Sequence, residues 1–318
     1  MTVDGYIAAA GGINVDIKGK SFERMVLGSS NPGAIEISPG GVACNISRNL
    51  ALLNVPVMLL SVIGSDAQGA KALQDIKSCG VCVDHVSKAD DGLTGTYIAL
   101  LDNMGEMTAA LSDMRILEKL DIAYFKSRFD ILEKASLIVC DANLPEESII
   151  FIASAADKWG IPLCLEPVSV RKALKLKNCL KGIDYITPNL DELRVLTGLG
   201  SKNAEVELMA TQLIESGVRN VITSLGKEGL CYTTAQGSKH YQSFPAYVTD
   251  VTGAGDSLTA GFLYGLMKYG NIDKSLICGL AAAAITISSE VTVSPRLSED
   301  RISELVHNYR NDSDYSIY

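Results

Sequence analysis

The residues with the clearest chemical potential form one short run near the C-terminal end, residues 250–257, with the sequence DVTGAGDS. Gly253, Ala254 and Gly255 are small, and a helical pattern follows them at once. Small residues before a helix start let backbone amides converge on one point, where the helix dipole adds partial positive charge. The run therefore predicts an anion site for a phosphoryl group in transfer, with Asp256 as the base for an attacking alcohol. On spacing alone, a helix cap with an acidic first turn is the more ordinary interpretation.

The position of Asp256 also predicts its protonation state. The positive end of a helix favours a carboxylate, so we expect a low pKa for Asp256 and an ionised group. Phosphoryl transfer has a loose transition state, so a weakly basic carboxylate suffices if it orients the attacking hydroxyl.

Alternating strand and helix patterns must position this site. Short β-rich runs alternate with longer helical periods, which predicts parallel strands joined by crossover helices. The expected strands are residues 6–10, 57–62, 82–86, 137–140, 162–165, 185–187 and 220–224. The expected helices are residues 42–53, 66–79, 146–159, 203–216, 255–269, 273–289 and 298–309.

Two segments interrupt this alternation. Residues 15–40 are rich in Gly, Ser and Pro, and residues 94–111 have a hairpin pattern that returns through Asp102-Asn103-Met104-Gly105. Strands inserted at about 15–40 and 94–111 would form a small sheet over one end of the core, a lid that excludes water during group transfer. The sequence therefore predicts a single domain over residues 1–318, with this lid as an insertion.

Composition and charge argue against several classes of protein. The chain has 318 residues, 47% of them hydrophobic, and a formal net charge of −9, which disfavours nucleic acid and anionic membrane surfaces as partners. No apolar run reaches the ~18 residues of a membrane span, and Asp4 stands where a signal peptide carries positive charge, so we expect a cytoplasmic protein. The eight cysteines, including the run Cys79-Gly80-Val81-Cys82, are expected to be reduced and mostly buried rather than metal-binding.

Four motifs resemble those of the ribokinase-like carbohydrate kinases, the PfkB family. They are PGGVACNISRNLA at residues 39–51, PNLDE at 188–192, TSLGKEG at 223–229 and DVTGAGDSLTAGFLYGL at 250–266. They follow the family order and span nearly the whole chain. The resemblance implies a ribokinase-like three-layer α/β/α sandwich with a mostly parallel central sheet. It also implies an ATP-dependent phosphotransferase that acts on an alcohol.

The resemblance assigns roles to residues of these motifs. Asp256 would be the catalytic base, and Gly253, Ala254 and Gly255 would supply amides to the phosphate. The residues that would contact the nucleotide are Asn189, Ser224, Gly226, Gly229 and Thr252.

Two cation sites are also implied. Glu192 would act on Mg²⁺ through water, and Asp250 would bind a monovalent cation such as K⁺. Without the family, an ordinary helix start with an acidic first turn explains Asn189 and Glu192 better.

The substrate would bind at the other end of the site. Alternation along a strand places Asn14 and Asp16 on the same side, and a carboxylate can accept two hydroxyl groups of a vicinal diol. The resemblance adds Gly40 and Gly41, which would let a ring approach the backbone, and Asn45. Turn and cap residues are the ordinary alternatives for Asn14, Asp16 and Asn45.

Shorter strings resemble one subgroup of the family, the pseudouridine kinases. They are SNPG at 30–33, LLDNMGEM at 100–107, SDM at 112–114, DAN at 141–143 and EPVS at 166–169. Ser112 and Glu166 depart from the subgroup, in which Asn and Asp are usual. Asn143, a candidate substrate residue, stands where ribokinases carry a glutamate.

The predicted function is therefore ATP-dependent phosphorylation of the 5′-hydroxyl of a nucleoside, with pseudouridine as the first candidate. A ribokinase- or fructokinase-like sugar kinase is one alternative, and a non-catalytic sugar- or nucleoside-binding protein is another. The predicted partners are this small molecule, ATP and a second copy of the chain, because exposed strand edges in the lid seek partners.

Overall fold

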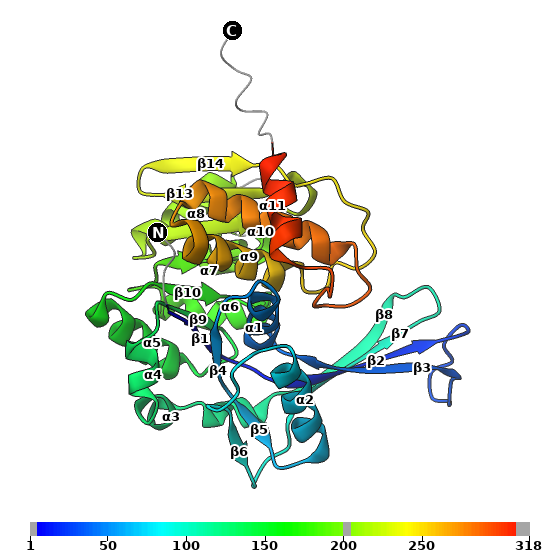
Figure 1. The fold of residues 1–318 in the computed structure, drawn as a ribbon. Coiled ribbons are helices and arrows are strands. Elements are labelled where there is room, and N and C mark those ends of the chain that lie inside the picture. The colour runs from blue at the N-terminus through cyan, green and yellow to red at the C-terminus, as the bar shows by residue number, and fades with distance from the viewer. Residues whose placement is uncertain (1–4, 200–204, 310–318) are drawn as a thin grey trace.

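The computed structural model describes residues 5–199 and 205–309 and has one large, mostly parallel sheet (Figure 1). Its strand order is β14-β13-β12-β11-β10-β9-β1-β4. The strands are β1 (Ile7–Ala10), β4 (Val57–Leu60), β9 (Leu137–Asp141), β10 (Leu163–Glu166), β11 (Tyr185–Ile186), β12 (Asn220–Ser224), β13 (Leu230–Thr234) and β14 (Gly237–Tyr241). Pairing is parallel from β4 through to β12, whereas β13 and β14 are antiparallel. The predicted mostly parallel α/β sheet is confirmed.

Helices cover both faces of this sheet. The helices are α1 (Val42–Leu52), α2 (Ala67–Ser78), α3 (Ile122–Lys126), α4 (Phe129–Glu133), α5 (Glu146–Trp159), α6 (Val170–Ala173), α7 (Leu190–Thr197), α8 (Val206–Glu215), α9 (Ala254–Tyr269), α10 (Ile272–Ile287) and α11 (Glu299–His307). Ile7 and Ala9 of β1 pack in one core with residues of α1, α9, α10 and α11, whereas Ala8 and Ala10 pack in a second core with residues of α5, α7 and α8. The two-residue period of the strand thus builds three layers.

One difference from the predicted elements has a local cause. The strand expected at residues 82–86 is wrong: Cys82 makes one bridge to Met58, and the Val86 N–H bonds the oxygen of Val83 in a turn. The short strand β6 (Ser87–Ala89) follows and pairs with β5 (Val62–Gly64). The start expected for helix 203–216 lies outside the described residues.

A second sheet projects from the side of the molecule (Figure 1). It has the order β3-β2-β7-β8, with β2 (Asn14–Ser21), β3 (Gly33–Gly40), β7 (Gly95–Leu101) and β8 (Met107–Asp113). We call it the projecting sheet. It is built from the two segments in which the sequence predicted inserted strands.

The faces of the projecting sheet differ in polarity. Register places Ile17 beside Ile37 and Ile98, and Ile98 beside Leu111, on what we call its apolar face. The opposite, polar face carries Asn14, Asp16 and Lys18, because neighbouring residues of a strand point to opposite sides.

None of the helices in residues 5–199 and 205–309 has the length and apolar composition that a membrane span needs.

Candidate active site

The start of α9 contains the run of small residues that the sequence singled out. Gly253 precedes the helix with φ 80°, and a Cβ on it would lie 2.3 Å from the backbone oxygen of Thr292. Glycine is required there by conformation and by space. Ala254 donates its N–H to the oxygen of Val251 over 3.2 Å, which closes a tight turn. A Cβ on Gly255 would meet no protein atom within 4 Å, so the open side of this turn lies at Gly255.

Asp256 lies in the first turn of α9 and connects that helix to α1. Nδ2 of Asn45 donates a hydrogen bond of 2.8 Å to Oδ2 of Asp256, although the two residues are 211 positions apart. Asn45 is buried, and its Oδ1 has no hydrogen-bond partner among the described residues. An unpaired buried acceptor is costly, so a ligand hydroxyl beside Asp256 would relieve it. The structure thus brings the predicted base and a predicted substrate residue into contact.

The protonation state of Asp256 differs from the expected one. Desolvation raises the pKa of Asp256 to about 7, and the like charges of Asp141, Asp16 and Glu192 add to this increase. The hydrogen bond from Asn45 acts in the opposite direction. The expectation of a low pKa from the helix terminus is therefore wrong, because burial among carboxylates outweighs it.

The predicted substrate residues Asn14 and Asp16 lie together on β2, as the strand alternation required. Nδ2 of Asn14 donates to Oδ1 of Asp16 over 2.5 Å. Burial raises the pKa of Asp16, against the hydrogen bond from Asn14 and the charge of Lys18. The charge of Asp16 contributes to the raised pKa of Asp256, and Gly40, which lies against Asp16, leads directly into the helix that carries Asn45.

Gly40 and Gly41 have a structural role that the sequence did not reveal. A Cβ on Gly40 would lie 2.3 Å from Oδ2 of Asp16, and one on Gly41, which has φ 100°, would lie 2.2 Å from the oxygen of Gly12. Protein atoms therefore occupy the space that each side chain would need. The absence of side chains at the two glycines thus leaves room for Asp16 and for the loop at Gly12. A contact between these glycines and a substrate ring remains a prediction.

Asp141, at the end of β9, joins three segments of the substrate side. Its Oδ2 accepts the N–H groups of Gly12 (3.1 Å) and Ala43 (2.9 Å), and its Oδ1 accepts that of Asn143 (2.9 Å). Asp141 is fully buried. The segments it joins precede Asn14, contain the start of α1, and carry Asn143. Sequence reasoning gave this residue no role, although its place at the carboxyl end of a core strand was a signal.

A pocket of about 490 Å³ lies beside the start of α9. Its lining includes Ser224, Gly226, Gly229, Ala254 and Gly255 from the predicted set. The apolar residues that complete it are Phe244, Pro245, Ala246, Val248, Val251, Leu258, Leu280, Ala283, Ala284 and Ile287. This combination of apolar walls and a glycine-rich helix start suits a flat ring attached to phosphates. The apolar walls come from loops, α9 and α10, and the sequence motifs did not indicate most of them.

Asn189 and Glu192 form the N-terminal capping box of α7. Oδ1 of Asn189 accepts the N–H groups of Asp191 and Glu192, and Oε2 of Glu192 accepts the N–H of Asn189 over 2.9 Å. The N–H of Ser224 bonds the oxygen of Pro188 over 3.0 Å, which holds this cap beside the end of β12. Asn189 and Glu192 therefore cap a helix, as the ordinary interpretation has it, and they also lie next to the pocket.

Glu166 adds a second buried carboxylate near Glu192. Oε2 of Glu166 accepts the hydroxyl of Thr187 over 2.5 Å, and its Oε1 accepts the N–H of Val168 over 3.2 Å. Desolvation, followed by the charge of Glu192, raises the pKa of Glu166 well above its usual range. Val168 has φ 71°, a strained conformation for a β-branched residue. Buried oxygen donors of like charge are the kind of set that fits Mg²⁺, because a cation offsets the charge of Glu192 that raises the pKa of Glu166.

Asp250 and Thr252 lie just before the helix start, on the side of the projecting sheet. Oδ1 of Asp250 accepts the N–H (2.8 Å) and hydroxyl (2.7 Å) of Thr252, and its Oδ2 lies 3.5 Å from Nζ of Lys18. Desolvation acts against ionisation, but these contacts outweigh it and lower the pKa of Asp250. An ionised carboxylate is thus available, although Lys18 already neutralises part of its charge. Its role as a ligand of a monovalent cation remains a prediction.

Comparisons with known proteins agree with this geometry. Residues 5–299 match the model of the pfkB family carbohydrate kinases. The chain is 32% identical to a pseudouridine kinase of Escherichia coli K12 over 95% of this chain and 97% of that protein. It is 27% identical to a guanosine-inosine kinase of Exiguobacterium acetylicum over 89% and 94% of the two chains. The structure of a ribokinase from Thermotoga maritima superposes with a TM-score of 0.86 at 21% identity, over 96% of this chain and 100% of that one.

The fold is therefore ribokinase-like, and the relatives include kinases that act on nucleosides. The protein is a phosphotransferase with a hydroxyl acceptor and ATP as donor. The chain belongs to the PfkB family of carbohydrate kinases.

Proposed function

We propose that this kinase transfers the γ-phosphoryl group of ATP to the 5′-hydroxyl of pseudouridine. The observation that carries the proposal is the Asn45–Asp256 hydrogen bond, 2.8 Å long, which lies between the polar face of the projecting sheet and the pocket at the start of α9. A ribose on the polar face and a nucleotide in the pocket would meet at Asp256. The similarity to a pseudouridine kinase over 95% of the chain supports the choice of nucleoside.

In this mechanism the ribose hydroxyls bind to Asn14 and Asp16. The 5′-hydroxyl donates to Asp256, and Oδ1 of Asn45 accepts a second ribose hydroxyl. As the hydroxyl oxygen bonds to phosphorus, the bond to the ADP oxygen breaks and the hydroxyl proton passes to Asp256. With a pKa of about 7, Asp256 is partly ionised at neutral pH and can accept that proton.

The start of α9 stabilises the transferred group through its N–H groups and its dipole. Glu192, Asn189 and Glu166 would hold Mg²⁺, partly through water. Bound there, Mg²⁺ would neutralise charge on the phosphates. The pocket holds the adenine by apolar contact, and Ser224 and Gly226 lie where polar edges of the nucleotide would approach.

The projecting sheet supplies residues that would recognise the base. Asp16 is the cross-strand neighbour of Tyr97, and Tyr97 that of Ser112, so all three share the polar face. An aromatic ring can stack on a nucleobase and a hydroxyl can bond its edge. Asn143 offers a donor and an acceptor where a carboxylate could only accept, which favours a nucleoside over a free sugar.

A coupled assay of ATP consumption tests this function with pseudouridine, uridine, guanosine, inosine, ribose and fructose. We expect the highest kcat/KM with pseudouridine. A preference for ribose or fructose would refute the nucleoside assignment and leave a sugar kinase. No turnover with any compound, together with measurable binding of one of them, would favour a non-catalytic binding protein.

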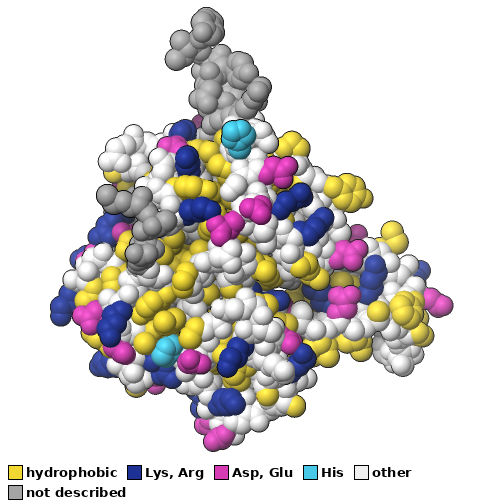
Figure 2. All heavy atoms as spheres, in the orientation of Figure 1, with side chains coloured by type: hydrophobic (Ala, Val, Ile, Leu, Met, Phe, Trp, Pro, Cys, Tyr) yellow, Lys and Arg dark blue, Asp and Glu magenta, His cyan; other side chains and the backbone are white. Residues whose placement is uncertain are grey.

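We also propose that the active protein is a homodimer joined through the apolar faces of two projecting sheets. Ile35, Ile37 and Leu111 on this face are 72%, 63% and 74% exposed, and Figure 2 shows hydrophobic side chains gathered on the sheet. Contiguous exposed apolar surface of this kind marks an interface. Sedimentation at micromolar concentration should give a dimer for the native chain and a monomer for Ile37→Lys. A monomeric native chain would refute the dimer.

A further inference from the structure

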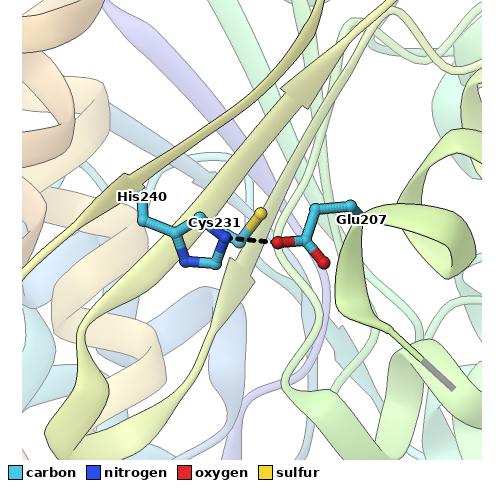
Figure 3. A group of neighbouring side chains, drawn as sticks. All are labelled: Glu207, Cys231 and His240. Atoms are coloured by element: carbon cyan, nitrogen blue, oxygen red, sulfur yellow. Dashed lines mark hydrogen bonds and ion pairs between the residues drawn. The ribbon is translucent and has the colours of Figure 1, made fainter.

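Three different metal-binding side chains gather at an edge of the main sheet, apart from the active-site residues (Figure 3). Glu207 comes from α8, Cys231 from β13 and His240 from β14. One potential ligand atom of each lies within 4.8 Å of the corresponding atom of the other two. No other cluster of at least three such ligands occurs in residues 5–199 and 205–309.

Regular secondary structure fixes this arrangement. Cys231 and His240 are directly opposite each other in the antiparallel pair β13–β14, so their side chains share one face of the sheet. Helix α8 packs on that face, where Glu207 Oε1 lies 2.6 Å from His240 Nε2. A change of register by one residue would move Cys231 to the other face, so strand pairing holds the three groups together.

The three side chains differ in how far they are buried. Cys231 is fully buried, whereas the side chains of His240 and Glu207 are 50% and 44% exposed. A cation could therefore enter from the solvent side and reach the sulfur once the imidazole and carboxylate separate slightly.

Two hydroxyl groups near the sulfur could orient it as a ligand. Sγ of Cys231 lies 3.6 Å from the hydroxyl of Thr233, which is 2.8 Å from the hydroxyl of Ser238. Outer hydrogen bonds of this kind orient a ligand and tune its affinity. Burial raises the pKa of the Cys231 thiol, so a metal ion must displace its proton to solvent when it binds.

We propose that Glu207, Cys231 and His240 form a binding site for Zn²⁺, with water as the fourth ligand. Thiolate, imidazole and carboxylate are the three donor types that Zn²⁺ takes in proteins. The hard cation Mg²⁺, which prefers oxygen ligands, would not compete well for a site with sulfur.

The bound ion would fasten α8 to the β13–β14 edge. Gly229, just before β13, and Ser243, two residues after β14, both line the nucleotide pocket. The site would therefore brace the hairpin that supports one wall of this pocket. This inference depends on the fold alone and not on which nucleoside is phosphorylated.

Cobalt substitution in the full-length protein tests the proposal, because Co²⁺ bound to a thiolate gives a charge-transfer band in the near ultraviolet. We expect a band that saturates at one Co²⁺ per chain and disappears when Zn²⁺ is added. Cys231→Ser should abolish the band. His240→Gln and Glu207→Gln, at exposed positions where folding is secure, should each weaken Co²⁺ binding by about tenfold or more.

The matched control is the double variant Cys79→Ser, Cys82→Ser, because these half-buried cysteines belong to the C-x-x-C run that the sequence offered as an alternative place for a metal. It should keep the band and the affinity of the native chain. The proposal is overturned if the native protein gives no band, if the band persists in Cys231→Ser, or if it is lost in the control. Unchanged affinity in both His240→Gln and Glu207→Gln would also overturn it.

Discussion

Replacing the proposed base should stabilise the folded protein while it removes activity. The pKa of Asp256 rises from 3.8 to about 7 on folding. Protonation of this carboxyl therefore favours the folded state. That contribution is fully present below the pKa of the unfolded chain and is lost as pH rises through about 7. The side chain of the Asp256→Asn variant cannot ionise, so the variant keeps at pH 8 the contribution to stability that the native protein loses.

The magnitude follows from the same pKa change. A difference of roughly three pH units corresponds to about 4 kcal/mol at most. Asp256 is partly exposed, so solvent screening reduces this figure, and we expect a gain of about 1–2 kcal/mol for Asp256→Asn at pH 8. The amide that replaces the carboxyl still has an oxygen to accept the hydrogen bond from Asn45, so little else should change.

Urea denaturation of the ligand-free native and variant proteins at pH 5 and pH 8 measures this effect. The gain in unfolding free energy of the variant should be about two fifths as large at pH 5 as at pH 8, because pH 5 already lies above the pKa of 3.8 in the unfolded chain, while kcat falls about 10²–10⁴-fold. Asp250→Asn is the control: its pKa is lowered, so the carboxyl is ionised at both pH values and the effect of the variant should not change between them. An effect of Asp256→Asn that is equal at pH 5 and pH 8 would refute the desolvated base and restore the helix-terminus argument.

Three further outcomes follow from the site. The kcat/KM for ATP, which reports the nucleotide-free enzyme, should rise between pH 5 and pH 8 with an apparent pKa near 7, and a flat profile over that range would contradict Asp256 as a desolvated base. Asp16→Ala should raise the KM for the nucleoside at least about tenfold while the KM for ATP changes little, and equal losses would count against the ribose contact. In Asp141→Asn the NH₂ group must face at least one of the three backbone donors, so urea denaturation should show a loss of about 1–3 kcal/mol, and a loss below about 0.5 kcal/mol would show that the three segments do not depend on this carboxylate.

Much of the fold could be predicted because local signals were strong. Helix α5 spans the predicted residues 146–159, since its apolar period is regular and Gly160 ends it with φ 69°. The strand β12 likewise spans the predicted residues 220–224. The hairpin β13–β14 was missed because Lys239 and His240 make its outer strand as polar as a loop. Only the pairing with the rest of the sheet reveals it as a strand.

The site was predictable in its parts and not in their connections. Gly253 could be identified from the sequence, because a run of small residues before a helix is a local pattern. The contact between Asn45 and Asp256 depends on how α1 packs against α9, which no local pattern reports. The role of Asp141 is hidden for the same reason, since its three hydrogen-bond donors come from distant or irregular segments.

The raised pKa of Asp256 reflects the charges of the whole site. A helix terminus offers partial positive charge at one point, but Asp16, Asp141 and Glu192 are full negative charges that reach Asp256 through a poorly solvated interior. Without bound ligands, the negative charges around Asp256 therefore keep this base partly protonated near neutral pH. Glu192 is among the residues that would hold Mg²⁺, so a cation bound there with the nucleotide would offset part of this charge and favour the ionised form of Asp256. The same carboxylates that weaken the free site would then couple nucleotide binding to the readiness of Asp256 for proton transfer.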